Sequence, residues 1–217
     1  MDQRIKLISR HNSCLNQIVF ELRAEKIQED RLRFRNNMEK VGELLAYEIS
    51  KELSYESQEV TTPLGTLDMA LPSHQPVIVS ILRAGVPLHN GLLRMFDKAD
   101  NGFISAYRHH TKGNEFIVKV EYIALPEPNG RALILADPMI ATGRSLVLSY
   151  KAIAEQSDEI GPVFVAGAIA SEEGLEYVLR HIPHAKIYVA AIDNELTARG
   201  YIVPGLGDAG DLAFGPK

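Results

Sequence analysis

The 217-residue sequence predicts an α/β protein in which a central parallel sheet carries helices on both faces. Segments of strand type alternate with segments of helix type between residues 77 and 191, which is the order of repeated strand–helix–strand units. The strand segments are continuous apolar runs, such as residues 76–82 and 133–136, as expected for strands covered on both faces. Arg83 and Asp137 directly follow these two runs, at the edge where open α/β sheets bind ligands.

The length and composition indicate one domain with a substantial core. We expect N-terminal helices and a β-hairpin arm over residues 1–75, a core over 76–191 and a C-terminal segment over 192–217. Apolar residues make up 46% and charged residues 24%, and the net charge of −5 argues against a general nucleic-acid binder. Cys14 is the single cysteine, which excludes an intrachain disulfide. There is no run of 18 apolar residues and no signal peptide, so we expect a soluble cytoplasmic protein without a membrane partner.

The N-terminal part begins with a short strand over residues 4–9 and continues mostly as helix over 15–53. Met38, Val41 and Ile49 belong to a series of apolar residues at helical spacing. The middle of this segment is rich in charged residues. They form either a basic patch for a phosphate-bearing ligand or a solvated, salt-bridged helix face, and we favour the solvated face. The charged residues are Arg23, Lys26, Arg31, Arg33 and Arg35, with Glu25, Glu29 and Asp30.

Residues 59–69 predict a β-hairpin with its turn at 63–65. A hairpin that projects with two exposed edges usually needs a partner. The alternative is a hairpin that folds back on its own domain, and both interpretations stay open at this point.

The first core unit is a strand over residues 76–82, a loop at Arg83-Ala84-Gly85 and a helix over 88–96. Arg83 is either a phosphate clamp or a loop arginine paired with a surface acid. A second strand covers 102–107, and the polar stretch 109–128 predicts a mobile hairpin that would exclude water from the site. His109 and His110 within it are better explained as exposed loop residues than as a metal pair, because no third ligand lies at a suitable spacing.

The junction at residues 133–145 is the centre of the predicted site. Its strand, 133–136, leads through Asp137 and a small-residue loop into a helix over 146–153. The first N–H groups of a helix lack intrahelical partners and carry the positive end of the macrodipole, so they form an anion site. Asp137 would face a ribose diol or a phosphate-bound metal ion rather than the phosphate itself. The alternative is an ordinary strand-to-helix turn.

The remaining core comprises a strand over 162–170, a helix from the predicted N-cap Ser171 to about residue 181, and a strand over 185–191. Residues 200–211 then contain four glycines and a proline, which excludes ordinary helix or strand. Such a stretch is suited to wrapping its backbone around a small flat ligand.

Several of these stretches together resemble the uracil phosphoribosyltransferases, which are type I phosphoribosyltransferases, and the resemblance covers almost the whole chain. The implied fold is therefore a type I phosphoribosyltransferase fold with a C-terminal hood, for which we use residues 192–217. The resembling residues are Phe34-Arg35, Tyr47-Glu48, residues 81–85, the phosphate loop at residues 137–145, and residues 201–211 followed by Phe214-Gly215.

The resemblance implies conversion of uracil and phosphoribosyl pyrophosphate (PRPP) to UMP and pyrophosphate in pyrimidine salvage. It implies Mg²⁺ bound through PRPP rather than by protein ligands, a homodimer or higher homo-oligomer that the hairpin arm helps to form, and GTP as an effector in some members. A purine-base phosphoribosyltransferase would share the phosphate loop but not the hood. Backbone groups of fixed polarity in the hood would accept uracil and reject cytosine, which reverses the pattern of donors and acceptors.

The resemblance also implies three sets of site residues. Asp208, Asp137 and Arg108 are the expected catalytic residues, with Asp208 assisting the N1 proton of uracil. Uracil would contact Ile202, Gly207, Asp208 and Ala209. PRPP would contact Arg83, Arg108, Asp208 and the phosphate loop, which consists of Asp137, Pro138, Met139, Ile140, Ala141, Thr142, Gly143, Arg144 and Ser145.

Three departures from the family pattern stand out. Arg144 occupies the place of a second glycine, Leu212-Ala213 and Pro216 alter the tail, and residues 109–128 match weakly. Two other classes are therefore weighed against the enzyme: a regulatory RNA-binding protein on the same fold and a catalytically silent relative. The single acid Asp137 and the acidic balance argue against the RNA-binding protein.

Overall fold

The structure is a computed structural model that describes residues 2–110 and 116–216, with side chains left undescribed over 106–119. Its centre is an eight-stranded sheet in the order β1-β10-β9-β7-β4-β5-β6, with β8 beside β9. The β5–β6 pair is antiparallel and the other pairs are parallel. The strands are β1 (Ile5–Leu7), β4 (Val77–Leu82), β5 (Asp100–His110), β6 (Phe116–Ala124), β7 (Leu133–Ala136), β8 (Met139–Ile140), β9 (Val163–Ser171) and β10 (Lys186–Asp193).

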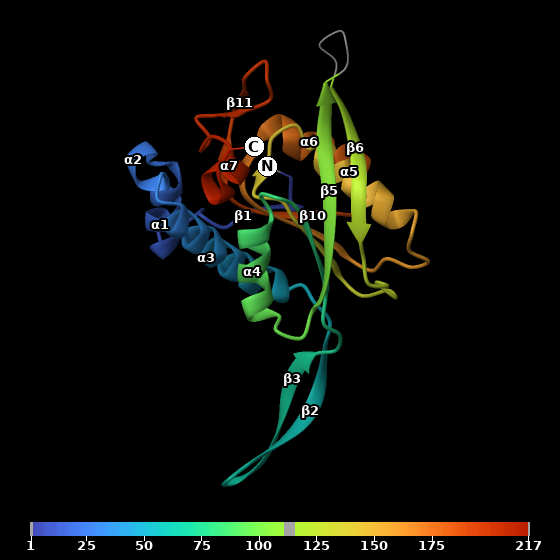
Figure 1. Ribbon diagram of the computed structural model, residues 1–217. Helices are drawn as coiled ribbons and strands as arrows, with labels where there is room; N and C mark the ends of the chain where they lie inside the picture. Colours follow the sequence, from blue (N-terminus) through green and yellow to red (C-terminus); the bar gives the residue numbers. More distant parts are fainter. Residues whose placement is uncertain (1, 111–115, 217) are drawn as a thin grey trace.

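Helices cover both faces of this sheet (Figure 1), which confirms the predicted fold class. Successive strand residues point to opposite faces, so Ile134 joins one apolar core and its neighbour Leu135 the other. The first core is closed by α1 (Cys14–Arg23), α3 (Arg31–Ser50), α4 (Val86–Met95) and α7 (Ala209–Phe214), and the second by α5 (Arg144–Ala154) and α6 (Glu172–His181).

Residues 15–53 are mostly helical, as the sequence predicted, and the helical segment is divided into three helices. α1 ends at Arg23, a single turn follows as α2 (Glu25–Gln28), and α3 begins after Asp30. The Asp30 carboxylate accepts hydrogen bonds from the amides of Leu32 and Arg33, which starts a new helix at this point.

The hairpin arm consists of β2 (Tyr55–Thr62) and β3 (Gly65–Pro72), and it projects away from the sheet (Figure 1). Every residue of β2 is exposed, as is every residue of β3 before Pro72. The alternative in which the hairpin folds back on its own domain is therefore wrong.

The second predicted hairpin, β5–β6, has its backbone in antiparallel register with an irregularity between Ser105 and Ala106. The side chains of His109 and His110 lie outside the described residues. The closing motion expected of this hairpin stays a prediction.

The hood contains more regular structure than the sequence predicted. β11 (Glu195–Leu196) pairs with β12 (Ile202–Val203), and α7 begins directly after Asp208. The exclusion of helix over residues 200–211 is therefore wrong at its end, because the Asp208 carboxylate caps the amides of Gly210 and Asp211. No helix in the described part of the chain is long and apolar enough to cross a membrane.

Candidate active site

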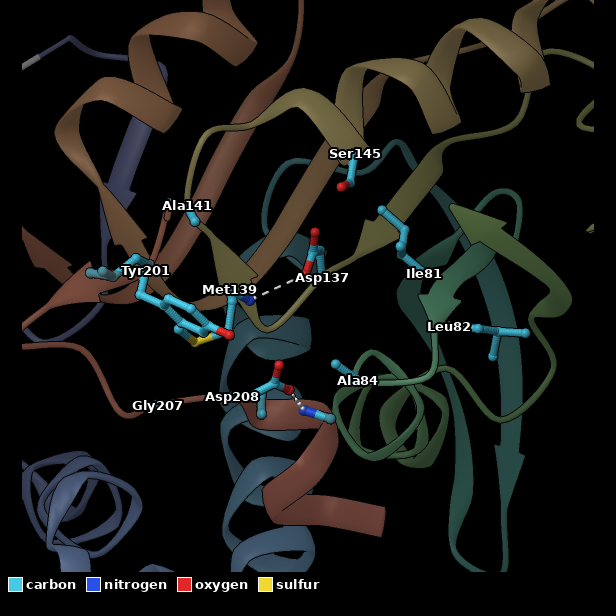
Figure 2. Close-up of a pocket in the computed structure, with 14 residues that line it drawn as sticks. Ile81, Leu82, Ala84, Asp137, Met139, Ala141, Ser145, Tyr201, Gly207 and Asp208 are labelled. Atoms are coloured by element: carbon cyan, nitrogen blue, oxygen red, sulfur yellow. Dashed lines mark hydrogen bonds between the residues drawn. The ribbon is translucent and has the colours of Figure 1, made fainter. Parts of the chain in front are cut away.

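A pocket of about 320 Å³ lies at the carboxyl ends of β4 and β7, where the hood meets the sheet (Figure 2). The chain runs from β4 outward to β5 and then returns to β7 on the other side of β4, so the strand order reverses between β4 and β7. Such a switch point is where open α/β sheets form their ligand crevice. The lining residues are Ile81, Leu82, Ala84, Asp137, Met139, Ala141, Ser145, Gly200, Tyr201, Ile202, Gly207, Asp208, Ala209 and Gly210.

The phosphate loop turns from β8 into α5 at Gly143, which has φ +69° and precedes the first helical residue. Among the described residues no side chain caps α5 by a hydrogen bond, so its first N–H groups are left for a ligand. A β-carbon on Gly143 would lie 2.7 Å from the carbonyl oxygen of Gly174, which explains the need for glycine here. This is the junction from which the sequence predicted an anion site, and the binding of an anion there stays a prediction.

The N-terminus of α6 supports the phosphate loop from behind. The buried Ser171 hydroxyl donates to the Ala141 carbonyl at 2.5 Å and accepts from the Gly174 amide at 2.9 Å. A β-carbon on Gly174 would lie 2.2 Å from the Ala141 oxygen, so the two backbones are in close contact. The predicted N-cap role of Ser171 is confirmed, and the same hydroxyl also fixes the loop.

The phosphate-loop residues divide between the pocket and the core. Asp137, Met139, Ala141 and Ser145 line the pocket, and the Oδ1 atom of Asp137 accepts from the Met139 amide at 3.2 Å. The other loop positions present little or no side chain to the pocket: Pro138, Ile140 and Gly143 are buried, Thr142 is half-buried, and Arg144 is exposed.

Of the two arginines expected to bind PRPP, Arg83 is not among the residues that line the pocket, and the side chain of Arg108 is not described. Arg83 follows β4 between the lining residues Leu82 and Ala84, and the peptide bond before it is cis. Its Nη2 atom donates to Asp211 Oδ1 at 3.2 Å and to the Gly215 carbonyl at 3.3 Å, so it is paired with an acid of the hood. Arg108 lies in β5, and its side chain is outside the described residues.

The hood supplies the opposite side of the pocket. Ile202, Gly207, Asp208 and Ala209, the four residues expected to contact uracil, all line it. Figure 2 shows Asp137 and Asp208 reaching the pocket from different elements, with Asp208 joined by a hydrogen bond to the start of α7. Six lining residues were not among the predicted site residues, although each lies in or next to a stretch that carries the resemblance, 81–85 or 201–211. They are Ile81, Leu82, Ala84, Gly200, Tyr201 and Gly210.

The fold and the site define an α/β protein with a pocket at its switch point, lined by a helix N-terminus on one side and by the backbone of the hood on the other. The chain belongs to the uracil phosphoribosyltransferase family, whose model matches residues 9–216.

Individual relatives agree with this assignment. The chain is 45% identical over 211 residues to the uracil phosphoribosyltransferase of Porphyromonas gingivalis, covering 97% of each protein. It is 38% identical over 203 residues to that of Thermococcus gammatolerans, covering 92% of this chain and 88% of the relative. The solved structure of AQ2163 protein from Aquifex aeolicus superposes with a TM-score of 0.85 at 28% identity, covering 97% of this chain and 98% of the other.

Proposed function

We propose that this protein transfers the phosphoribosyl group of PRPP to N1 of uracil, releasing pyrophosphate and forming UMP. The observation that carries the proposal is that a single pocket joins the phosphate loop to the hood in a member of the uracil phosphoribosyltransferase family. A phosphate site and a base site that face each other would hold both parts of a nucleotide at once.

The 5-phosphate of the ribose would bind the first turn of α5. Its charge would meet the backbone N–H groups and the positive end of the helix dipole. The Ser145 hydroxyl lines the pocket beside these groups and would add a donor. Arg144 is exposed at the first position of α5, where it would add positive charge without filling the pocket.

Asp137 would hold the ribose rather than the phosphate. Its Oδ1 atom accepts from the Met139 amide, which fixes the carboxylate at the end of β7. Ribose hydroxyl groups can donate hydrogen bonds to the carboxylate, whereas the negative charge of a phosphate would be repelled by it.

The hood would recognise the base through its backbone. The lining residues Ile202, Gly207 and Ala209 carry no polar side-chain atoms, so N–H and C=O groups are their only hydrogen-bonding groups. Uracil presents an N3–H donor between two carbonyl acceptors, and cytosine reverses this pattern at positions 3 and 4. A backbone slot matched to uracil would leave unpaired groups with cytosine, which costs affinity.

The reaction would proceed by positioning and electrostatic stabilisation. The bond from ribose C1 to pyrophosphate breaks, C1 gains oxocarbenium character, and N1 of uracil forms the new bond. The N1 proton would pass to Asp208, whose Oδ1 atom is held by the amides of Gly210 and Asp211 while its carboxylate lies at the pocket. Arg108 would bind the departing pyrophosphate, and Arg83 would do so by exchanging its bonds to Asp211 and Gly215 for bonds to the ligand.

Mg²⁺ would enter with PRPP. Among the described residues no group of three or more histidine, cysteine, aspartate or glutamate side chains could hold a metal ion. Pyrophosphate oxygens are ligands that Mg²⁺ prefers, and Asp137 and Asp208 place carboxylates at the same pocket. Bound there, the ion would offset charge on the leaving pyrophosphate.

The arm supports a homo-oligomer. Leu64 at its tip is 100% exposed, and Leu67, Met69 and Leu71 on β3 are also exposed apolar residues. A second copy of the chain would cover this apolar surface and the edges of the hairpin. A GTP effector and a cytoplasmic location stay predictions.

The proposal is tested by UMP formation from labelled uracil with PRPP and Mg²⁺, with cytosine, hypoxanthine and orotate as parallel substrates. We expect turnover with uracil alone. No turnover with any base, despite measurable PRPP binding, would contradict the proposal and favour a silent or regulatory relative. Turnover with hypoxanthine would contradict the assignment of the hood as a uracil site.

A further inference from the structure

A charged pair joins the N-terminal helices to the end of the sheet beside the hood. Arg23, the last residue of α1, binds Asp193, the last residue of β10, through two parallel hydrogen bonds of 2.8 Å each. The Asp193 side chain is 8% exposed and that of Arg23 is 24% exposed, so the pair is largely shielded from water. A bidentate pair of this kind fixes both side chains in one orientation.

The same pair binds both backbone polar groups of Gly205. Arg23 Nη1 donates to the Gly205 carbonyl at 3.0 Å, and the Gly205 amide donates to Asp193 Oδ2 at 2.9 Å. Gly205 is buried with φ +57°, and a β-carbon there would lie 2.2 Å from the Ile202 carbonyl oxygen. The pair therefore holds the chain between Ile202 and Gly207, two residues that line the pocket.

Two further contacts run from the N-terminal helices to the hood. Arg35 Nη1 donates to the Ala213 carbonyl at 2.7 Å. With its amide nitrogen as donor, Gln28 binds the Leu206 carbonyl at 2.7 Å. Neither residue lines the pocket, so their contacts act on the hood backbone from outside.

These contacts resolve the role of the charged N-terminal segment. Arg33 behaves as the predicted solvated face, with a side chain 54% exposed and ion pairs to Glu21 at 3.5 Å and Asp30 at 3.9 Å. Arg23 and Arg35 instead point to the hood, which neither sequence interpretation anticipated.

We infer that Arg23 and Asp193 are positioning residues that set the hood backbone for recognition of the base, an inference that rests on the proposed function. Loss of either partner would leave the other as a shielded, unpaired charge and would remove the bond to one polar group of Gly205: its carbonyl if Arg23 is lost, its amide if Asp193 is lost. The chain from Val203 to Gly207 would then relax. Recognition by backbone N–H and C=O groups depends on their placement to within less than 1 Å, so uracil would bind more weakly. The phosphate loop has its own support at Ser171 and keeps its geometry.

A purely structural pair would behave differently. It would lower stability and reduce activity without favouring one substrate. The positioning role requires that the Michaelis constant for uracil rise while the constant for PRPP stays near its original value.

The test compares Arg23→Lys, Arg23→Ala and Asp193→Asn with the control Arg33→Ala, which removes exposed ion pairs from the same helical segment. Lysine keeps the charge but not the bidentate geometry, so Arg23→Lys keeps the test valid if Arg23→Ala does not fold. We expect the KM for uracil to rise about tenfold and the KM for PRPP to change less than about twofold, with Arg33→Ala unchanged. Equal changes in both constants, or none, would overturn the inference.

Hydrogen exchange of the free protein gives a readout that needs no activity. We expect faster exchange in Arg23→Lys at the amides of Gly205, Leu206 and Gly207, with exchange across residues 139–145 unchanged. Unchanged exchange in the hood would overturn the positioning role even if uracil is the substrate. If exchange is faster only at Gly205, Leu206 and Gly207 in Arg23→Lys, but the wild-type protein does not convert uracil, the proposed function is wrong and the support of the hood by this pair still stands.

Discussion

The two sides of the pocket are held in place by different means. The phosphate loop is nine consecutive residues, and its support is close backbone packing against Gly174 with one buried hydroxyl, that of Ser171. The hood is instead held by charged side chains from far along the chain, since Arg23 and Gly205 are 182 residues apart and Arg35 and Ala213 are 178 apart. The position of the phosphate loop therefore depends on close backbone packing, and the position of the hood depends on a few long-range polar bonds.

This difference implies that each side can be damaged separately. A bulky residue at the packed contact should displace the phosphate loop, and a lost charge at the N-terminal helices should loosen the hood. Substitutions of both kinds, ordered by expected effect, test how far the two sides are independent.

The largest effect is expected from Gly174→Val. Its β-carbon would lie 2.2 Å from the Ala141 oxygen and 2.7 Å from the Ile140 oxygen, so the phosphate loop must move. Since a displacement of about 1 Å costs roughly 100-fold in rate, we expect kcat/KM to fall at least about 100-fold in steady-state assays. Gly65→Ala is the control, because nothing lies within 4 Å of that position. Near-normal activity of Gly174→Val would show that the loop does not need this packing.

Asp208→Asn tests the chemistry on the hood side. Its amide oxygen would still accept from the amides of Gly210 and Asp211, so α7 keeps its cap. Without a proton acceptor for N1, kcat should fall about 100-fold while circular dichroism and melting temperature stay close to the original. Unchanged turnover would remove Asp208 from its catalytic role.

Ser171→Ala tests the phosphate side more gently. It removes the hydrogen bond to the Ala141 carbonyl and the cap of α6. We expect a loss of about 1–2 kcal/mol in the free energy of unfolding by urea titration. The KM for PRPP should rise about fivefold, with the KM for uracil unchanged. Ser50→Ala is the control, because its hydroxyl bonds the Tyr47 carbonyl at an exposed site. If Ser171→Ala raised only the KM for uracil, the phosphate loop would be the uracil side of the pocket and not the PRPP side.

The smallest effect concerns stability alone. Burial lowers the pKa of His89 below its ordinary value of 6.5. The unfolded chain therefore binds the proton more readily, and the free energy of unfolding should fall as the pH drops below 6.5. His89→Leu removes this titration, so the wild type should lose stability relative to the variant as the pH falls from 7.5 to 5, as measured by urea titration. A pH-independent difference would contradict the buried, neutral histidine.

The contrast between the two sides also explains what the sequence could reveal. A strand–loop–helix junction is local, so the order from Leu133 to Ser145 was enough to predict this junction, which lies at the pocket, and the resemblance added four hood residues that also line it. The supports of the hood arise only when α1 and β10 meet in three dimensions. Asp193 carried one usable signal, because it is an acid at the end of an apolar run, as Asp137 is.

The side-chain direction of Arg83 is a second case. Its position after β4 was predicted, yet its ion pair with Asp211 depends on α7, which the glycine content of the hood concealed. The Asp208 cap was the local signal for α7, since aspartate is a preferred N-cap residue.

The most direct test of the account is a double-mutant cycle on Ser171→Ala and Arg23→Lys, measured as initial rates over a grid of uracil and PRPP concentrations. The account predicts that the first variant raises the KM for PRPP, that the second raises the KM for uracil, and that the double variant shows both increases independently. If both variants raise the same constant, or if the double variant departs strongly from the product of the two effects, the two sides of the pocket are not held separately and the account is wrong.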